Sequence, residues 1–180
     1  SDALNLAPGR RVVLLVPGTE VGLAEPELPL RSGARLAQVV PYALEEQLAS
    51  DVDALHFAVG ARSAGAVGTP VAFVARSLMQ RWYDQCEAAG IHPDAAYADS
   101  TAVPAAATGC TLLLEETLLY VRRADSLPYV LDATDLPAAL ELALGAAHSV
   151  AESGENVTFY AGTTEYEQHR DAIEGLRERT

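Results

Sequence analysis

Residues 34–60 read ARLAQVVPYALEEQLASDVDALHFAVG, and the spacing of the apolar residues in this stretch decides how the fold begins. Up to residue 48, apolar side chains recur at intervals of three and four, which predicts one buried stripe on a helix. The stripe consists of Leu36, Val39, Val40, Ala43, Leu44 and Leu48. Pro41 lies inside this pattern and cannot donate a hydrogen bond to the carbonyl of Ala37. We therefore expect the helix to bend at Pro41 or to restart with Pro41 in its first turn.

The second half of the stretch predicts a short strand. Residues 55–59 alternate between apolar and polar positions, and Gly60 ends the run. Asp51 and Asp53 form an acidic turn before it. A helix, a turn and a strand make a structural unit, so we expect Leu44 and Leu48 to be core residues and not site residues.

The same stretch carries a family resemblance. Leu28-Pro29, then Pro-Tyr-Ala-Leu-Glu-Glu-Gln-Leu at 41–48, then Leu-His-Phe-Ala at 55–58 follow one another in this order. This series resembles the signature of the cytoplasmic domain of type II secretion system protein L. The resemblance is specific in this segment, and weaker but collinear through the rest of the chain. It implies an α/β chain with the actin-like, ribonuclease-H-like ATPase fold.

Composition excludes several classes of function. The chain has 25 acidic and 12 basic residues, a net charge of −13, and no lysine. Such a charge argues against binding to nucleic acid or to anionic lipid. The missing lysine excludes a phosphate-gripping P-loop and every Schiff-base mechanism. No apolar run approaches the roughly 18 residues of a membrane span, so we expect the chain as given to be soluble.

The rest of the sequence predicts two units of strands and flanking helices. Strands are expected at 11–17, 70–74, 95–98, 111–114, 118–121, 129–131 and 156–161. Ser77 is the expected N-cap of one helix, Asp135 caps a second that runs to about residue 149, and Thr164 starts the last. Small residues after Ser100 mark the best boundary, so we predict domains at 1–99 and 100–180. Cys86 and Cys110 are expected to be buried free thiols.

No catalytic pattern is present, and we predict a protein that is not an enzyme and holds no cofactor or metal. Ser63 lacks the first glycine of a nucleophile elbow. The four histidines, His56, His92, His148 and His169, have no metal-site spacing. Actin-like ATPases cradle phosphate on glycine-containing hairpins, whereas the hairpin here turns at Glu115-Glu116-Thr117. Near the position of adenosine, Ala161-Gly162-Thr163 retains a single glycine.

The resemblance implies a scaffold at the cytoplasmic face of the bacterial inner membrane. It implies recruitment of the N-terminal domain of the secretion ATPase, the E protein, and association with the platform proteins M, C and F or in a homodimer. Family members carry further strands before Arg11, and a transmembrane helix with a periplasmic domain after the cytoplasmic one. We therefore expect this chain to be a truncated fragment that meets the membrane only through a segment it lacks. The acidic positions expected to bind a partner are Glu115, Glu116, Asp132 and Asp135. Two alternatives stay open: a nucleotide-binding or weak ATPase module of the same fold, and a pilus-assembly platform protein.

Overall fold

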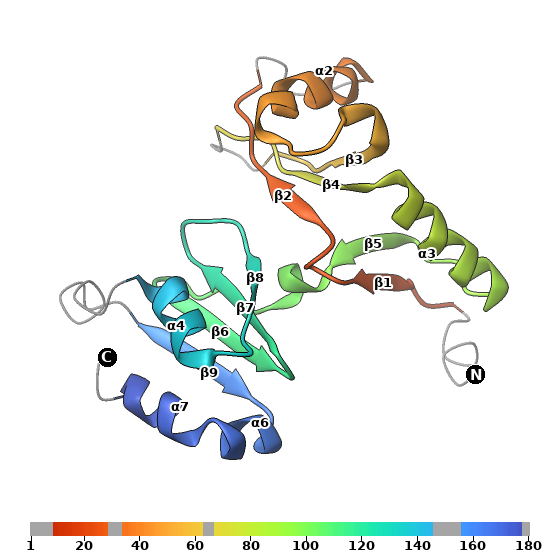
Figure 1. The fold of residues 1–180 in the computed structure, drawn as a ribbon. Coiled ribbons are helices and arrows are strands. Elements are labelled where there is room, and N and C mark those ends of the chain that lie inside the picture. Colours follow the sequence, from red (N-terminus) through yellow and green to blue (C-terminus); the bar gives the residue numbers. More distant parts are fainter. Residues whose placement is uncertain (1–8, 29–33, 63–66, 146–155, 178–180) are drawn as a thin grey trace. The chain divides into compact units, whose positions relative to one another are not determined.

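The structure is a computed structural model that describes residues 9–28, 34–62, 67–145 and 156–177 (Figure 1). Its contacts divide the chain into two compact units. The first unit comprises Ser1–Val16 and Glu20–Tyr97, and the second comprises Pro17–Thr19 and Ala98–Thr180. The short segment 17–19 therefore packs with the second unit although it precedes most of the first. Whether 1–99 and 100–180 fold as separate domains stays a prediction.

Helix α2 (Ala34–Leu44) packs on a three-stranded antiparallel sheet in the first unit. The sheet has the order β2 (Gly22–Ala24), β4 (Val71–Ala75), β3 (Leu55–Val59), with Phe57 opposite Phe73. Leu36, Val40 and Leu44 of the predicted stripe supply the helical side of the core, which also contains Leu28 and Val71. Ala43, predicted in the same stripe, is exposed. The core prediction for Leu44 is confirmed, since its side chain is 1% exposed.

Pro41 does not restart the helix. Helix α2 continues through Pro41 to Leu44 and is followed by a 3-10 turn, η1 (Glu45–Gln47). A second 3-10 turn, η2 (Val52–Ala54), begins where the Asp51 carboxylate accepts a hydrogen bond from the Asp53 amide at 2.9 Å. Because the regular helix ends early, Leu48 lies in extended backbone after η1 and is only half-buried.

The first unit also contains a two-stranded sheet of β1 (Val13–Val16) and β5 (Ala95–Ala98), of which the last residue, Ala98, is assigned to the second unit. Helix α3 (Arg76–Ala88) leads from β4 towards β5. The prediction that Ser77 caps this helix is wrong, because the helix begins at Arg76 and Ala75 occupies the cap position without a side-chain hydrogen bond. The helix ends at Ala88 with Ala89 as its C-cap. Gly90 follows with φ 66°, and the Ile91 amide donates to the Cys86 carbonyl at 2.9 Å. This bond identifies a Schellman motif.

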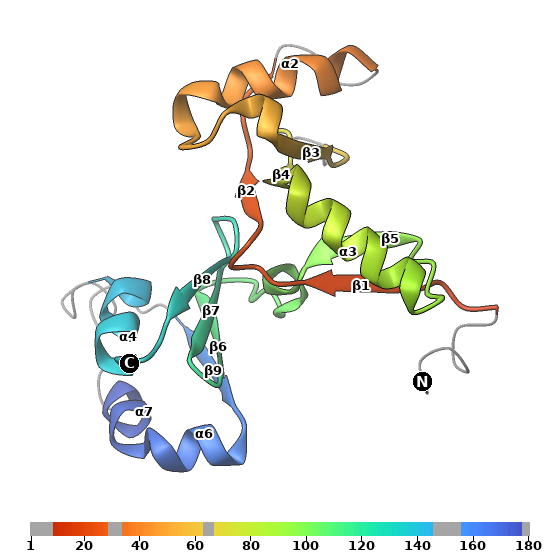
Figure 2. The same cartoon turned by 45° about the vertical axis from the view of Figure 1, so that its right-hand side comes forward.

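The second unit is built on a four-stranded mixed sheet. Its order is β8 (Tyr129–Asp132), β7 (Leu118–Arg123), β6 (Cys110–Glu115), β9 (Val157–Ala161), and only β6 and β9 are parallel. A 3-10 turn, η3 (Asp99–Ala102), precedes β6. Helices α4 (Leu136–Leu144) and α7 (Arg170–Arg177) lie on the same side of the sheet (Figure 2), and with it they enclose the larger core. That core includes Leu112, Leu114, Leu119, Leu136 and Ile173.

Two helix ends in the second unit differ from the sequence prediction. Asp135 caps α4 as expected, accepting from the Ala138 amide at 3.2 Å, but α4 ends at Leu144, and residues 146–155 lie outside the described residues. The single last helix is two helices, α6 (Thr163–Gln168) and α7, with non-helical backbone at His169. Gly162 holds the N-cap position of α6, so Thr164 lies inside the helix and caps nothing.

The two cysteines occupy different environments. Cys110 is fully buried in the larger core, as predicted, whereas Cys86 on α3 is half-buried, and neither cysteine is part of a disulfide. Within the described ranges, no helix combines the length and the apolar character needed to cross a membrane.

Candidate functional site

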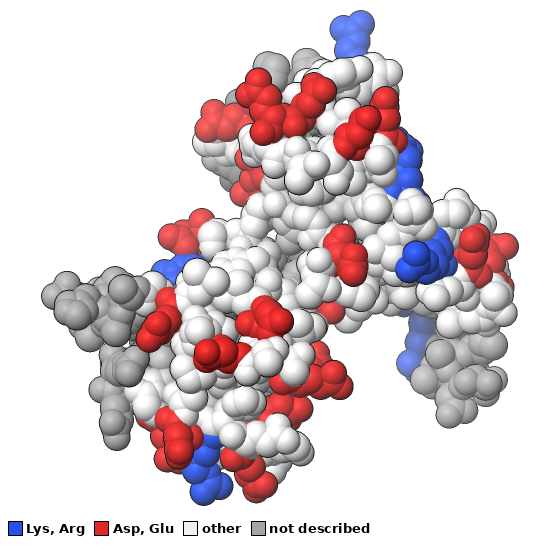
Figure 3. Space-filling model, in the orientation of Figure 1, with Lys and Arg blue, Asp and Glu red and all other residues white. Residues whose placement is uncertain are grey.

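The four predicted acidic residues gather at one end of the four-stranded sheet. Leu118 is paired with Glu115 on one side and with Asp132 on the other, so the two carboxylates flank it on one sheet face. Glu116 follows at the turn, and Asp135 begins α4 three residues after Asp132. All four acidic side chains are exposed, and acidic atoms gather where β6 ends (Figure 3). We name Glu115, Glu116, Asp132 and Asp135 the acidic end.

The hairpin turn of the acidic end is narrow and contains no glycine. Glu116 has φ 52°, a left-handed conformation that is uncommon for a residue with a side chain. Two residues of this turn, Glu115 and Glu116, carry carboxylates, and their negative charges would repel a phosphate group from the backbone amides. In the part of the chain that the structure describes, neither the Glu115 nor the Glu116 side chain forms a hydrogen bond or ion pair, so both carboxylates are available to a partner.

The other two carboxylates of the acidic end are already hydrogen-bonded. Asp132 is the last residue of β8, where its Oδ1 accepts from the Thr134 amide at 2.7 Å and from the Thr134 hydroxyl at 2.5 Å. These two bonds stabilise the carboxylate and lower the pKa of Asp132. Asp135 is held by its capping bond. A partner would therefore find its freest carboxylates at Glu115 and Glu116.

Sequence reasoning missed a second polar cluster, around Asp99. The Asp99 carboxylate accepts from the Gly18 amide at 2.8 Å and from the Tyr120 hydroxyl at 3.1 Å. Burial of Tyr120, together with the Asp99 charge, raises the pKa of the Tyr120 hydroxyl to about 12. All three residues belong to the second unit. An aspartate at the carboxyl end of a predicted strand was the one signal that could have drawn attention to this cluster.

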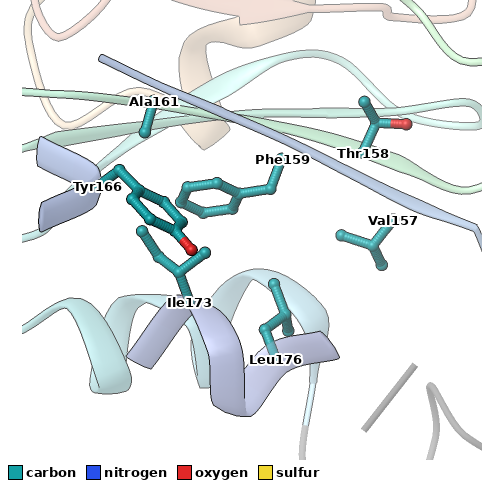
Figure 4. A pocket seen from close by; sticks show the side chains of 7 residues that line it. All are labelled: Val157, Thr158, Phe159, Ala161, Tyr166, Ile173 and Leu176. Carbon is teal, nitrogen blue, oxygen red and sulfur yellow. The ribbon is translucent and has the colours of Figure 1, made fainter. Parts of the chain in front are cut away.

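An open pocket lies between β9 and the last two helices (Figure 4). It has a volume of about 390 Å³ and is lined by Val157, Thr158, Phe159, Ala161, Tyr166, Ile173 and Leu176. The hydroxyl group of Tyr166 donates to Glu174 Oε1 at 3.1 Å. Among the described residues, the lining contains no carboxylate, imidazole or thiol, and its polar side chains are Thr158 and Tyr166. The pocket is therefore suited to holding apolar side chains.

The remaining residues considered in the search for chemistry stay apart. His56 lies on β3, while exposed His92 is 4.0 Å from Glu87 and His169 separates α6 from α7. Within the described ranges, no three histidine, cysteine or acidic side chains come together as a metal site would require. Pro29 of the Leu-Pro pair, Ser63 and His148 lie outside those ranges.

In the second unit, strands β8, β7 and β6 form an antiparallel meander, β9 lies parallel to β6, and helices cover the sheet. This arrangement, together with the mixed sheets and helices of the whole chain, is that of an α/β chain of the actin-like class. The fold matches the cytoplasmic domain of EpsL, an inner-membrane component of the type II secretion system of Vibrio cholerae, with a TM-score of 0.67 and 25% identity. The match covers 89% of this chain and 66% of that one. The model of the family "Type II secretion system (T2SS), protein L" matches residues 2–171, and the chain belongs to that family.

Two curated relatives show how much of the family's length is present. Type II secretion system protein L of Pectobacterium carotovorum is 37% identical over 110 residues, and that of Dickeya chrysanthemi is 36% identical over 109 residues. Each alignment covers 61% of this chain, but only 25% and 27% of the two relatives. The matched region is thus about a quarter of each relative's length. The expectation that the chain belongs to protein L is confirmed.

Proposed function

We propose that this chain is a non-catalytic scaffold that recruits the secretion ATPase, through the ATPase's N-terminal domain, to the cytoplasmic face of the inner membrane. Membership in the protein L family supports a place in the type II secretion machinery. The observation that carries the recruiting role is the acidic end, where Glu115 and Glu116 are exposed and free to bind a basic surface. The membrane connection would come through a segment of the longer protein. Platform proteins M, C and F, and a second copy of the chain, are further proposed partners.

Charge complementarity would serve this role by steering the partner. The net charge is −13, and acidic side chains cover more of the visible surface than arginines do (Figure 3). Complementary charges accelerate encounter and suppress wrong partners, and added salt weakens both effects. The Glu115 and Glu116 carboxylates are exposed and can bind a partner without breaking a hydrogen bond within the chain. Asp132 and Asp135 already accept hydrogen bonds, which they would have to share with a partner.

The test is calorimetric titration of the ATPase N-terminal domain into the chain and its charge-reversed variants. Glu116→Arg is expected to weaken binding by about 2 kcal/mol or more if it lies at the centre of the contact. Glu141→Arg is the matched control, because it makes the same charge change at an exposed position on α4, away from the hairpin. If wild type shows no binding at low salt, recruitment is wrong. If wild type binds and both variants bind equally well, the acidic end is not the docking face.

A thermal-shift measurement tests the non-catalytic part of the proposal. A ligand that binds only the folded state raises the melting temperature. With Mg-ATP we expect no shift, because the hairpin turn carries two carboxylates and no glycine. A rise in melting temperature that disappears in a Thr117→Val or Gly162→Val variant would favour the nucleotide-binding alternative.

A further inference from the structure

The chain passes between its two units three times, after Val16, after Thr19 and after Tyr97. Two short segments of the second unit therefore adjoin these crossings: Pro17–Thr19, and the residues that follow Tyr97. A direct hydrogen bond joins the two segments, because the Gly18 amide donates to Asp99 Oδ1 at 2.8 Å. The two partners are 81 residues apart in the sequence.

The second oxygen of Asp99 connects this pair to the sheet. Asp99 Oδ2 accepts from the hydroxyl of Tyr120, which lies mid-strand on β7, opposite Leu113 and Val130. Tyr120 is 6% exposed, so surrounding side chains hold its ring and hydroxyl in place. One carboxylate therefore bridges segment 17–19 to the central part of the sheet.

The close fit around Gly18 is independent evidence that this bridge is built into the fold. A β-carbon at Gly18 would lie 2.7 Å from Asp99 Oδ1 and 2.9 Å from the hydroxyl oxygen of Ser100. Ser100 is 2% exposed. Only a residue without a side chain can bring its amide this close to the carboxylate without displacing these atoms.

The segment after Tyr97 has anchors of its own. The Thr101 hydroxyl donates to the Ala98 carbonyl at 2.6 Å, which closes the η3 turn. Arg122 Nη1 on β7 donates to the Thr101 carbonyl at 3.2 Å. Both segments are thus tied to β7, one through Asp99 and Tyr120, the other through Arg122.

We propose that Asp99 is a positioning residue that clasps both connecting segments to the second unit. Residues 17–19 and 98–102 then move with the second unit. Any reorientation of the two units takes place where the chain passes between them, after Val16, after Thr19 and after Tyr97. This device goes beyond ATPase recruitment and does not depend on it. It acts through hydrogen bonds that lie wholly within the second unit.

The test compares Asp99→Ala with Asp94→Ala. Asp94 makes the same kind of bond, accepting from the Val12 amide at 2.7 Å, but in the first unit. Two measurements are made on each variant. The first is hydrogen exchange of the Gly18 amide. The second is the distance distribution between spin labels attached to Tyr83→Cys and Leu142→Cys in a Cys86→Ala background. Tyr83 and Leu142 are exposed and belong to different units.

Asp99→Ala is expected to speed Gly18 exchange by about tenfold or more and to broaden the distance distribution, because segment 17–19 is released. Asp94→Ala should leave both unchanged. The proposal is wrong if Asp99→Ala changes neither quantity, or if Asp94→Ala broadens the distribution equally. If Asp99→Ala does not fold, Tyr120→Phe removes only one bond and should raise Gly18 exchange about threefold. Unchanged exchange in Tyr120→Phe would then overturn the clasp.

Discussion

At the scale of single residues, Tyr120 shows how one buried hydroxyl links stability to alkaline pH. Its pKa is raised from 10.0 to about 12 by burial and by the neighbouring Asp99 carboxylate, so the folded state favours the neutral phenol. The stabilisation from this group is complete below pH 10 and is lost as the pH rises towards 12, because the unfolded chain ionises first. The maximum slope is about 1.4 kcal/mol per pH unit.

We therefore predict that wild type loses stability relative to Tyr120→Phe between pH 10 and about 12. Urea unfolding of both proteins across this range measures the difference, and the phenylalanine variant controls for the other tyrosines, Tyr129 included, whose pKa burial also raises. Parallel curves for the two proteins would contradict the prediction.

At acid pH, Asp132 links stability to pH with the opposite sign: stability is lost as the pH falls. The Thr134 hydroxyl and amide lower its pKa, so its stabilising effect is present above the ordinary aspartate pKa and is lost as the pH falls through the lowered value. Thr134→Val removes the hydroxyl donor and should raise the pKa of Asp132 towards its usual range. Carboxyl-carbon NMR titration measures this shift. Thr117→Val, on the adjoining turn, is the control that should leave it unchanged, and equal titration curves in wild type and Thr134→Val would rule out the hydroxyl bond as a cause.

Some local hydrogen bonds were predictable from sequence, and distant ones were not. The Asp135 cap follows from neighbours within three residues and is present, whereas the caps predicted at Ser77 and Thr164 are absent. Asp99 was missed because its donors, Gly18 and Tyr120, are 81 and 21 residues away. No spacing rule connects residues so far apart, and only the folded sheet brings them together.

At the scale of elements, α2 shows where periodicity is reliable and where it fails. The spacing rule correctly placed Leu36, Val40 and Leu44 in the core. It overestimated the burial of Leu48, because a 3-10 turn at 45–47 turns the chain by a different angle per residue from an α-helix. A stripe counted at 3.6 residues per turn loses its register there.

This difference predicts unequal costs for two leucine truncations. Leu44→Ala should destabilise the first unit by about 2–5 kcal/mol, because it opens a cavity in a closed core. Leu48→Ala should cost about 1 kcal/mol, because the side chain is already half-exposed to water. Urea unfolding of both variants measures the two values, and equal costs would show that the 3-10 turn does not change how Leu48 packs.

Two glycines in the second unit predict opposite effects of the same substitution. A β-carbon at Gly109, which has φ +85°, would lie 2.0 Å from the Asn156 carbonyl oxygen beside the start of β9. Gly109→Ala should therefore destabilise by about 2 kcal/mol or more. Gly175, inside α7, has open space, so Gly175→Ala should stabilise by roughly 0.5–1 kcal/mol through helix propensity. Thermal unfolding of the two variants decides, and a neutral Gly109→Ala would mean that the backbone shifts to accommodate the methyl group.

At the scale of the whole molecule, the sequence predicted the family and the positions of most strands, while the domains at 1–99 and 100–180 stay a prediction. Apolar runs located the strands. An alternating run is typical of a strand buried on one face, and a continuous run is typical of a strand buried on both faces. The assignment of residues 17–19 to the second unit could not be inferred in this way, because it depends on the Gly18–Asp99 bond and not on a composition change. The docking face is likewise invisible to periodicity, since exposed acidic residues follow no spacing that distinguishes a partner surface from an ordinary one.

The two units lead to a last prediction about cooperativity. Trp82 is the sole tryptophan and lies on α3 in the first unit, so its fluorescence reports that unit alone, whereas far-ultraviolet circular dichroism reports both. If the units unfold independently, Leu114→Ala in the second core should split the dichroism transition and leave the tryptophan transition in place. Leu44→Ala should shift the tryptophan transition, and Leu142→Ala, at an exposed position, should shift neither. Coincident shifts of both probes in Leu114→Ala would instead mean that the two units unfold as one, and domains at 1–99 and 100–180 would not be separate folding units.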